Sequence, residues 1–316
     1  MDIKKRKFVR LLGTSLIAPS LLSACSVPGS RNAATLASNE FSFGLQLSTI
    51  TPLLLSDFEG TLTEVAKVGY SQVEFSAMGF LGRPAAQVKA LLAENGLSAP
   101  VGRVSPMLPE GFFQLSRPEM MSAFMQLSSL DKLVDNVRYS LQVAHTLDQR
   151  FLNIPAINPS SFANTTSLNQ IIDLLSEAGE VCSAEGVLLG YHNHDWEFAP
   201  IRNEAGAAVV PYDVMLEKTD AKLVSFQLDA HWVTKAGADM YGYLERYPGR
   251  FASCHLKDID AEGGMADVGE GEIDFPKFIQ AAKRSGAQHF FVERDNPPEP
   301  MKSATVSFAN LSRMKL

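Results

Sequence analysis

Four segments of this chain combine a short apolar run with side chains that ligate metals or transfer protons. The segments are 187–198 (Val-Leu-Leu-Gly-Tyr-His-Asn-His-Asp-Trp-Glu-Phe), 223–231, 251–258 and 289–295. Such runs predict strands buried on both faces, and polar residues just past such strands are where α/β proteins place their chemistry. Four of the six histidines lie at or just past these strand ends: His192, His194, His231 and His255. We therefore predict one site assembled from the ends of neighbouring parallel strands.

Two imidazoles and two carboxylates from these strand ends form the predicted metal site: His192, Asp229, His255 and Glu293. Mixed nitrogen and oxygen ligation suits one divalent ion, and Mn²⁺, Zn²⁺, Co²⁺, Mg²⁺ and Fe²⁺ are all consistent with it. Each residue alone has a structural interpretation, because a strand-end aspartate is often a helix cap and a single histidine is often a core residue. Their recurrence on consecutive strands favours the metal site. The remaining histidines, His145 and His289, we assign to structure.

Other polar and aromatic side chains lie beside these ligands in the sequence. With His192 and Glu293, the residues predicted to transfer protons or orient ligands are His194, Glu197 and Lys257. The residues predicted to contact substrate are His231, Trp196, Trp232 and Glu270. The aromatic rings would form a wall on which a sugar ring packs, and the Gly-Glu-Gly-Glu segment at 269–272 would form a loop over the site. Core packing of the aromatics and a simple turn are the competing interpretations.

The chain alternates between strand and helix patterns throughout. Strands are predicted at 41–47, 72–75, 98–104 and 151–155, from Val187, from Leu223, and at 250–256 and 288–292; helices are predicted at 56–68, 85–94, 131–147, 168–185, 239–246 and 275–285, and from Pro300. A segment rich in Pro, Met and Phe, ending at about Glu119, interrupts the pattern, and a long loop with a short helix occupies 199–219. Eight strand–helix units predict a single (β/α)8 TIM barrel. The competitor is an open doubly wound sheet, but no GxGxxG motif follows the first strand.

The N-terminus has the features of an export signal. A basic opening (Lys4 to Arg10), an apolar run (Leu11 to Leu22) and small residues predict a signal peptide over 1–24. Leu22-Ser-Ala-Cys25 resembles a lipobox, which makes Cys25 the predicted lipidated residue, and Lys5 to Arg10 also resembles a twin-arginine signal. Residues 25–41 have linker composition, and 42–316 form the predicted catalytic barrel. We expect an exported protein, periplasmic or on the cell surface, held at the membrane only by a lipid anchor.

The net charge argues against nucleic-acid binding, and the cysteine spacing argues against cysteine metal ligands. The formal net charge is −7, and removal of the basic leader makes the mature chain more acidic. An acidic chain without a basic patch is a poor candidate for nucleic-acid binding. Cys182 and Cys254 lack CxxC spacing and are predicted to be buried free thiols.

Several motifs together resemble the sugar phosphate isomerase/epimerase family, which has the xylose isomerase-like TIM barrel. They are Gly190-Tyr-His-Asn-His-Asp-Trp-Glu-Phe198, Gln227-Leu-Asp229, His255-Leu-Lys-Asp258, Asp267-Val-Gly-Glu-Gly271 and Phe291-Val-Glu293. The resemblance covers roughly residues 42–312. It implies a sugar substrate and one divalent metal held by Glu, Asp, His and Glu on four successive strands. Asp229, His255 and Glu293 match the last three ligands, and His192 stands where the family has Glu. The resemblance also suggests a homodimer.

The implied reaction removes a proton next to a carbonyl and forms an enediolate, whose charge a metal stabilises. Return of a proton gives isomerisation or epimerisation of a free sugar, keto-sugar or glycoside. Loss of a β-substituent instead makes the protein a keto-sugar or cyclitol dehydratase or lyase. A third alternative is a sugar-binding lipoprotein without turnover.

Overall fold

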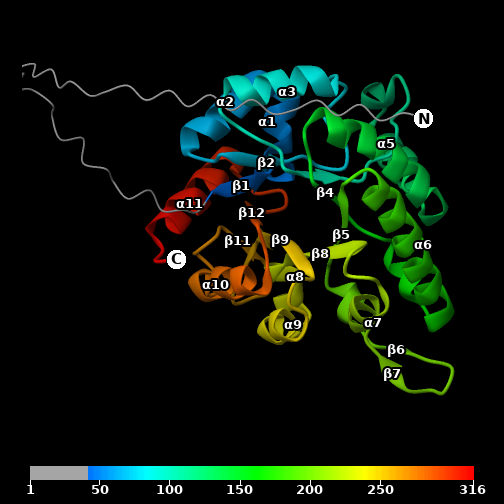
Figure 1. The fold of residues 1–316 in the computed structure, drawn as a ribbon. Helices are drawn as coiled ribbons and strands as arrows, with labels where there is room; N and C mark the ends of the chain where they lie inside the picture. Colours follow the sequence, from blue (N-terminus) through cyan, green and yellow to red (C-terminus); the bar gives the residue numbers. More distant parts are fainter. Residues whose placement is uncertain (1–41) are drawn as a thin grey trace, which may run out of the picture. The chain divides into compact units, whose positions relative to one another are not determined.

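A computed structural model describes residues 42–316. The predicted signal peptide, the predicted lipidation site at Cys25 and the predicted linker lie outside the described residues. Eight parallel strands form one sheet in the order β2-β1-β12-β9-β8-β5-β4-β3, and helices surround it (Figure 1). These strands are β1 (Phe43–Gln46), β2 (Gln72–Glu74), β3 (Val101–Arg103), β4 (Phe151–Ile154), β5 (Leu188–His192), β8 (Val224–Asp229), β9 (Phe251–Leu256) and β12 (His289–Val292). The predicted single (β/α)8 TIM barrel is confirmed.

The barrel is nearly closed, and its seam lies between β2 and β3. A single bridge joins Gln72 to Ser98 there, and the Val73 amide donates to the Ser98 carbonyl at 2.8 Å. No further strand pairing joins β2 to β3 in the described part of the chain. A cavity of about 440 Å³, lined by aromatic side chains and Arg103, lies beside this seam.

Helices cover the outside of the barrel. They are α1 (Thr51–Ser56), α2 (Phe58–Val68), α3 (Ala85–Glu94), α4 (Arg117–Leu127), α5 (Leu133–Thr146), α6 (Thr165–Ala184), α7 (Pro211–Lys218), α8 (Ala230–Lys235), α9 (Met240–Arg246), α10 (Phe275–Ser285) and α11 (Pro300–Arg313). Two short hairpins, β6 (Ile201–Arg202) with β7 (Ala208–Val209) and β10 (Asp258–Ile259) with β11 (Met265–Ala266), extend from the loops. The ranges predicted for α3 and α10 agree with the structure at every residue.

Three helices were not predicted from the sequence: α1, α4 and α8. Helix α4 begins within the Pro-, Met- and Phe-rich segment, where Ser116 and Glu119 form a capping box. This Ser-x-x-Glu pattern is a helix-start signal that the sequence did contain. Helix α8 begins directly after β8, and Asp229 caps it by accepting from the Trp232 amide at 3.2 Å. Its six residues are too few to show a helical period.

Side chains fill the barrel interior in layers, because residues two apart on a strand share a face. An apolar layer consists of Val101, Phe151, Ala252 and Phe291. Two residues further along their strands, β3 and β4 carry Arg103 and Asn153, and Glu293 follows β12. A polar layer therefore lies above the apolar one, toward the carboxyl ends of the strands.

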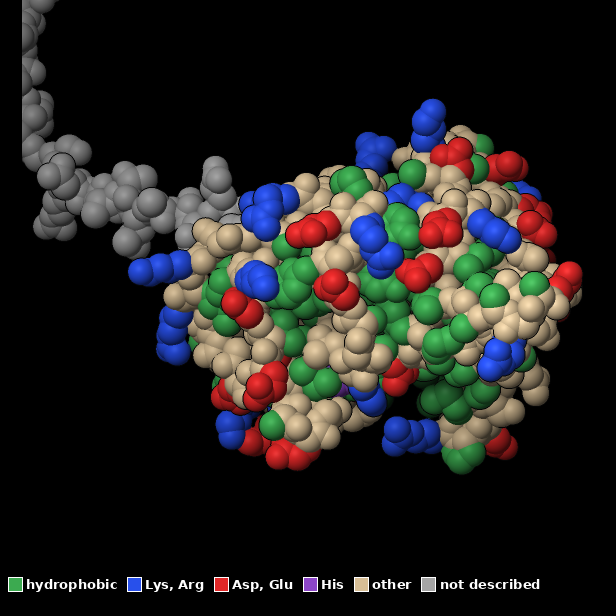
Figure 2. All heavy atoms as spheres, turned by 90° about the horizontal axis from the view of Figure 1, so that it is seen from below, with side chains coloured by type: hydrophobic (Ala, Val, Ile, Leu, Met, Phe, Trp, Pro, Cys, Tyr) green, Lys and Arg blue, Asp and Glu red, His purple; other side chains and the backbone are tan. Residues whose placement is uncertain are grey.

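The surface of the barrel carries charges of both signs. Figure 2 shows Lys and Arg side chains interspersed with Asp and Glu over one face, with hydrophobic side chains between them. No helix within residues 42–316 has the length and apolar character needed to span a membrane.

The cysteines and the two remaining histidines have structural surroundings. Cys182 and Cys254 are both buried and free, as predicted. His145 pairs with Glu185 at 3.1 Å on the surface, and His289 contacts Gln72 at 3.0 Å.

Candidate metal site

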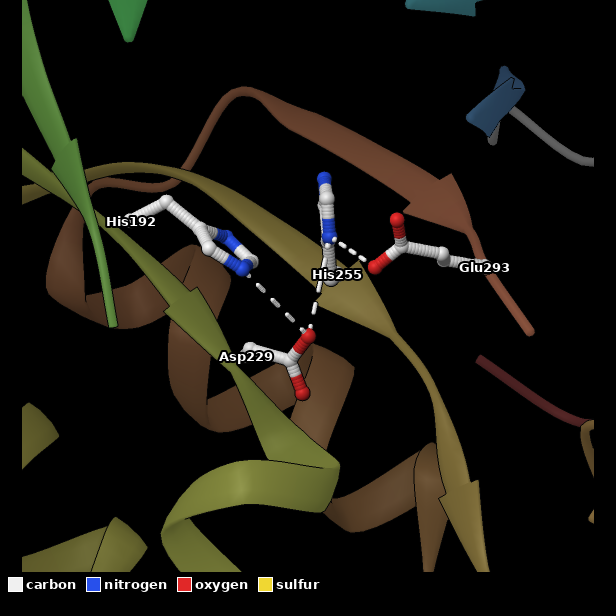
Figure 3. A group of neighbouring side chains, drawn as sticks. All are labelled: His192, Asp229, His255 and Glu293. Carbon is white, nitrogen blue, oxygen red and sulfur yellow. Dashed lines mark hydrogen bonds and ion pairs between the residues drawn. The ribbon is translucent and has the colours of Figure 1, made fainter. Parts of the chain in front are cut away.

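The four predicted ligands meet at the carboxyl ends of their strands (Figure 3). His192 ends β5, Asp229 ends β8, His255 lies in β9, and Glu293 directly follows β12. One donor atom from each of the four lies within 4.8 Å of the others, and all four side chains are buried. Since β5, β8, β9 and β12 are consecutive in the sheet, the fold brings these sequence-distant residues together.

The spacing of the donor atoms fits a divalent ion. His255 Nδ1 lies 2.8 Å from Glu293 Oε2 and 3.6 Å from Asp229 Oδ2, and His192 Nε2 lies 3.9 Å from the same aspartate oxygen. Donor atoms about 2.1 Å from a common ion lie roughly 3 to 4 Å from one another. The two distances to Asp229 lie in this range, and the shorter His255–Glu293 distance is that of a hydrogen bond. Asp229 Oδ2 is buried and has no hydrogen-bond partner among the described residues. Such an uncompensated acceptor is costly unless a cation binds it.

Opposite charges set the protonation of His255 and Glu293. Burial lowers the pKa of His255, but Glu293 and Glu74 outweigh burial and raise this pKa well above its usual value. Burial raises the pKa of Glu293, but Lys257 and His255 hold it well below its usual value. In the chain without a bound metal ion, His255 is therefore an imidazolium that donates to Glu293. Because a ligating histidine must be neutral, metal binding would release this proton.

Lys257 supplies a fixed positive charge beside the ligands. Its side chain is only 2% exposed, and Nζ lies 2.9 Å from Glu293 Oε2, 2.8 Å from Asp295 Oδ2 and 3.8 Å from Asp229 Oδ2. Burial lowers the pKa of Lys257, but these carboxylates, Glu293 first, raise it above its usual value. The structure therefore brings this predicted residue into contact with the ligand cluster.

An aromatic group borders the cluster on the β5 and β8 side. The ring of His194 lies 4.9 Å from that of His192 and stacks on Trp196 at 4.1 Å with an interplanar angle of 8°. Trp232 lies 5.4 Å from His194 and 4.7 Å from His231. The buried polar atoms of this group that have no hydrogen-bond partner among residues 42–316 are His194 Nδ1, Trp196 Nε1, His231 Nε2 and Trp232 Nε1. Ligand hydroxyl groups could satisfy them.

The structure does not bring Glu270 or Glu197 into the cluster. Glu270 is exposed and is not one of the four clustered residues. Glu197 is fully buried, and both of its oxygens are occupied, one by the Tyr191 hydroxyl at 2.5 Å and one by the His194 amide at 2.9 Å. The geometry of Glu197 therefore favours an anchor for the His194 backbone over a proton-transfer group.

Glu197 makes stability depend on pH. Burial raises its pKa to about 7, above the value of about 4.3 expected in the unfolded chain. The folded chain therefore holds a proton that the unfolded chain loses, and stability falls as the pH rises through this window. Glu197→Gln removes this titration, so its unfolding free energy relative to the wild type will rise by about 2 to 3 kcal/mol between pH 5 and pH 8. Urea unfolding across this range will measure the difference; a pH-independent difference would contradict it.

The Gly-Glu-Gly loop is held by Asp258 rather than by contacts of Glu270. The buried Asp258 carboxylate accepts from the amides of Ile259, Gly269, Gly271 and Ile273 at 2.9 to 3.2 Å. A Cβ at Gly271 would lie 2.5 Å from Asp258 Oδ1, so the loop needs glycine at this position.

Asp258→Asn will destabilise the chain by about 2 to 4 kcal/mol, because an amide group then faces backbone donors that need an acceptor. Urea unfolding will measure this change. Asp260→Asn, in the neighbouring exposed turn, is the control and will change stability little. Equal effects of the two substitutions would show that the loop does not depend on Asp258.

Sequence reasoning missed Glu74, which is fully buried beneath the ligands. Its Oε2 lies 2.7 Å from His255 Nε2 and 3.1 Å from Arg103 Nη2. The available signal was an acidic residue at the end of a predicted strand. It has no histidine near it in the sequence and therefore did not stand out.

Comparison with known proteins agrees with the fold. A family model described as xylose isomerase-like TIM barrel matches residues 62–310. Because the match covers most of the chain, this protein belongs to the xylose isomerase-like TIM barrel family.

Similar proteins carry the names of isomerases, epimerases and dehydratases. A sugar phosphate isomerase/epimerase from Parabacteroides distasonis ATCC 8503 is 22% identical, with a TM-score of 0.70, and the match covers 90% of this chain and 98% of that one. The 3-keto-D-glucoside 4-epimerase YcjR from E. coli is 13% identical, with a TM-score of 0.61, covering 85% and 98%. An inosose dehydratase of Geobacillus thermodenitrificans (strain NG80-2) is 26% identical over 140 residues, 39% of this chain and less than half (45%) of that protein. At these identities the solved structures establish the fold alone.

Proposed function

We propose that this protein is a divalent-metal-dependent sugar isomerase or epimerase that removes a proton next to a carbonyl. The observation that carries the proposal is the meeting of His192, Asp229, His255 and Glu293 at one buried point of a xylose isomerase-like barrel. The proposed substrate is a free sugar, a keto-sugar or a glycoside. The epimerases among the similar structures support this class of reaction.

Glu293 is the proposed proton acceptor. A divalent ion held by the four ligands would supply positive charge that stabilises negative charge developing on substrate oxygens. The C–H bond next to the carbonyl breaks, the proton moves to a carboxylate oxygen of Glu293, and the electron pair forms the double bond of an enediolate. Lys257, 2.9 Å from Glu293, keeps this carboxylate ionised before the transfer.

The β5 side of the cluster would provide the second proton-transfer group. His192 and Glu293 lie at opposite ends of the cluster (Figure 3). His194 lies on the His192 side, its Nδ1 has no hydrogen-bond partner among the described residues, and burial lowers its pKa to about 4, which keeps it neutral near pH 7. A proton exchanged on this side, opposite Glu293, would invert the configuration of the carbon.

Metal analysis of the full chain, purified without chelator, tests the proposal. We expect about one divalent transition metal per chain, and solvent deuterium will enter the C–H bond next to the carbonyl of keto-sugar substrates. Glu293→Gln will weaken metal binding and abolish the exchange. The control Glu185→Gln, at an exposed glutamate that pairs with His145, will leave both unchanged. A wild-type chain that binds no divalent metal under any loading condition would refute the proposal and favour sugar binding without turnover.

A dehydratase is the second candidate, because the similarity to the inosose dehydratase favours it. Proton removal would be the same, but a hydroxyl group on the neighbouring carbon would then leave with a proton as water. Mass spectrometry of the product separates the two reactions. A dehydratase product is lighter than the substrate by one water. An epimer made in deuterium oxide instead carries one deuterium in place of one carbon-bound hydrogen.

We also propose export and lipidation at Cys25, on the lipobox-like Leu22-Ser-Ala-Cys25. An exported enzyme would meet free sugars and glycosides more readily than sugar phosphates. Cys25→Ala will move the protein from the membrane fraction to the soluble fraction, as measured by immunoblotting of fractionated cells. Retention in the membrane fraction would exclude a lipid anchor at this cysteine.

A further inference from the structure

Buried polar side chains beside the ligand cluster converge on the carboxylate of Glu74. Its Oε2 lies within hydrogen-bond distance of His255 Nε2 at 2.7 Å, Arg103 Nη2 at 3.1 Å and Gln46 Nε2 at 3.2 Å. Its Oε1 accepts from Gln227 Nε2 at 3.0 Å. Arg103, whose guanidinium has donors only, forms a buried ion pair with Glu74 at 3.1 Å, so the carboxylate is ionised. An ionised carboxylate only accepts hydrogen bonds, and every group facing it must donate.

This requirement fixes the orientation of the Gln227 amide. Its NH₂ group must face Glu74, and its carbonyl oxygen Oε1 then lies 3.1 Å from His192 Nδ1. A carbonyl oxygen also only accepts, so Nδ1 of His192 must carry the hydrogen. The lone pair of the neutral ring is then on Nε2, the atom that faces Asp229 Oδ2.

The same requirement directly fixes which ring nitrogen of His255 carries a hydrogen. His255 Nε2 lies 2.7 Å from Glu74 and must donate its hydrogen there. Arg103 Nη2 lies 3.2 Å from the same ring nitrogen because both groups donate to one oxygen. The nitrogen left to present a lone pair, once the ring is neutral, is Nδ1, which faces Glu293 and Asp229.

A third branch of hydrogen bonds reaches Glu293. Gln46 donates to Glu74, and its other amide atom, Oε1, accepts from the Ser48 backbone amide at 2.7 Å. The Ser48 hydroxyl in turn donates to Glu293 Oε1 at 3.0 Å. Glu74 is therefore linked to three of the four ligands.

We propose that Glu74 is a positioning residue that selects the metal-binding tautomers of both histidines, of His255 directly and of His192 through Gln227. The divalent metal it serves is the one in the proposed function, on which this inference rests. Carboxylate or amide partners on the far nitrogen of a ligating histidine hold its tautomer and orientation, and their loss typically lowers metal affinity about 10- to 100-fold.

The substitution Glu74→Gln has a specific consequence in this network. Three donors surround the Oε2 position, so the glutamine oxygen takes that place and its NH₂ group faces Gln227. The amide of Gln227 must then rotate, and its NH₂ group faces His192. The hydrogen of His192 moves from Nδ1 to Nε2, and the lone pair no longer faces the metal site.

Nitrogen-15 spectra of labelled histidine in the metal-free full chain will report the tautomer of His192, assigned by comparison with a His192→Asn variant. We expect Nδ1–H in the wild type and Nε2–H in Glu74→Gln. Competition with a chelator will measure Zn²⁺ affinity, which we expect to fall about 10- to 100-fold in the variant.

A double variant that exchanges the side chains of positions 74 and 227 should restore the tautomer of His192. In the double variant Glu74→Gln with Gln227→Glu, the new carboxylate accepts from both His192 Nδ1 and the new glutamine. The Nδ1–H tautomer and most of the Zn²⁺ affinity will return. Asn153→Ala is the control, because Asn153 lies in the polar layer of the barrel but contacts Ser253 and neither ligand histidine. It will keep the wild-type tautomer and affinity.

Two results would overturn the inference: an unchanged His192 tautomer in Glu74→Gln, or no recovery of the tautomer and Zn²⁺ affinity in the double variant. Failure of the proposed function is a separate outcome. A wild-type chain that binds no Zn²⁺ or Mn²⁺ refutes the metal site, whereas the tautomers in the metal-free chain still decide the role of Glu74.

Discussion

Asp229→Asn will leave the chain folded but remove most of its divalent-metal binding, with affinity lowered at least about 100-fold. Asp229 Oδ2 has no hydrogen-bond partner among residues 42–316 and lies 3.6 and 3.9 Å from the two ligand histidines. An amide in this place loses the negative charge and can turn an NH₂ group toward the ion, and mixed ligation without this carboxylate binds divalent ions poorly. The amide oxygen can still cap α8 as Asp229 Oδ1 does, so the fold is retained. Metal content after dialysis and the circular dichroism spectrum will measure the two effects.

Asp295→Asn is the matched control for this experiment. Asp295 is also an acid past a strand end and contacts Lys257 at 2.8 Å, but it is not one of the four clustered residues. We expect the Asp295→Asn variant to retain its bound metal. Equal metal loss in both variants would mean that general negative charge, rather than ligation by Asp229, retains the ion.

The ligand set could be predicted because each member ends an apolar run. His192, Asp229 and Glu293 stand where a buried strand stops, and His255 lies one residue before the end of β9. In a TIM barrel all strands are parallel, so their carboxyl ends meet at one rim. Strand order and this rule together predict the neighbours without any knowledge of side-chain contacts.

Glu74 and its partners could not be predicted in this way. Glu74 and His255 are 181 residues apart, and β2 has only three residues. The contact arises because the barrel curves until the β2 and β9 side chains meet in its interior, and this curvature depends on strand tilt and stagger. Local patterns in the sequence do not specify either quantity.

The loop at 269–272 shows a different limit of sequence reasoning. The competing interpretation of this segment as a turn agrees with the structure, in which the Glu270 amide donates to the Asp267 carbonyl and Gly269 has a φ of +84°. The residue that holds it, Asp258, was noticed only as part of the family motif. A carboxylate that accepts four amides is recognisable only when the loop conformation is known, because the donors lie 1 to 15 residues away.

Lys257→Met will destabilise the metal-free chain by about 3 to 5 kcal/mol, because the buried carboxylates of Glu293 and Asp229 then keep only the His255 imidazolium as a neighbouring cation. Lys257 is the cation within 4 Å of Glu293, Asp295 and Asp229 together. The loss of unfolding free energy will be smaller near pH 5, since carboxylates with fewer nearby cations have raised pKa values and can take up protons. It will also be smaller when a divalent ion is bound, because the ion replaces part of the missing positive charge.

Lys235→Met is the matched control for this charge effect. Both lysines lie over the ring of Trp232, Lys235 Nζ at 4.8 Å and Lys257 Nζ at 5.1 Å, but Lys235 is exposed. Losing a contact with the aromatic ring at an exposed site costs only about 0.5 to 1 kcal/mol. Urea unfolding of both variants, with and without Mn²⁺, separates the two contributions. If Mn²⁺ stabilises Lys257→Met no more than the wild type, then Lys257 does not balance the charge of the carboxylates that hold the ion.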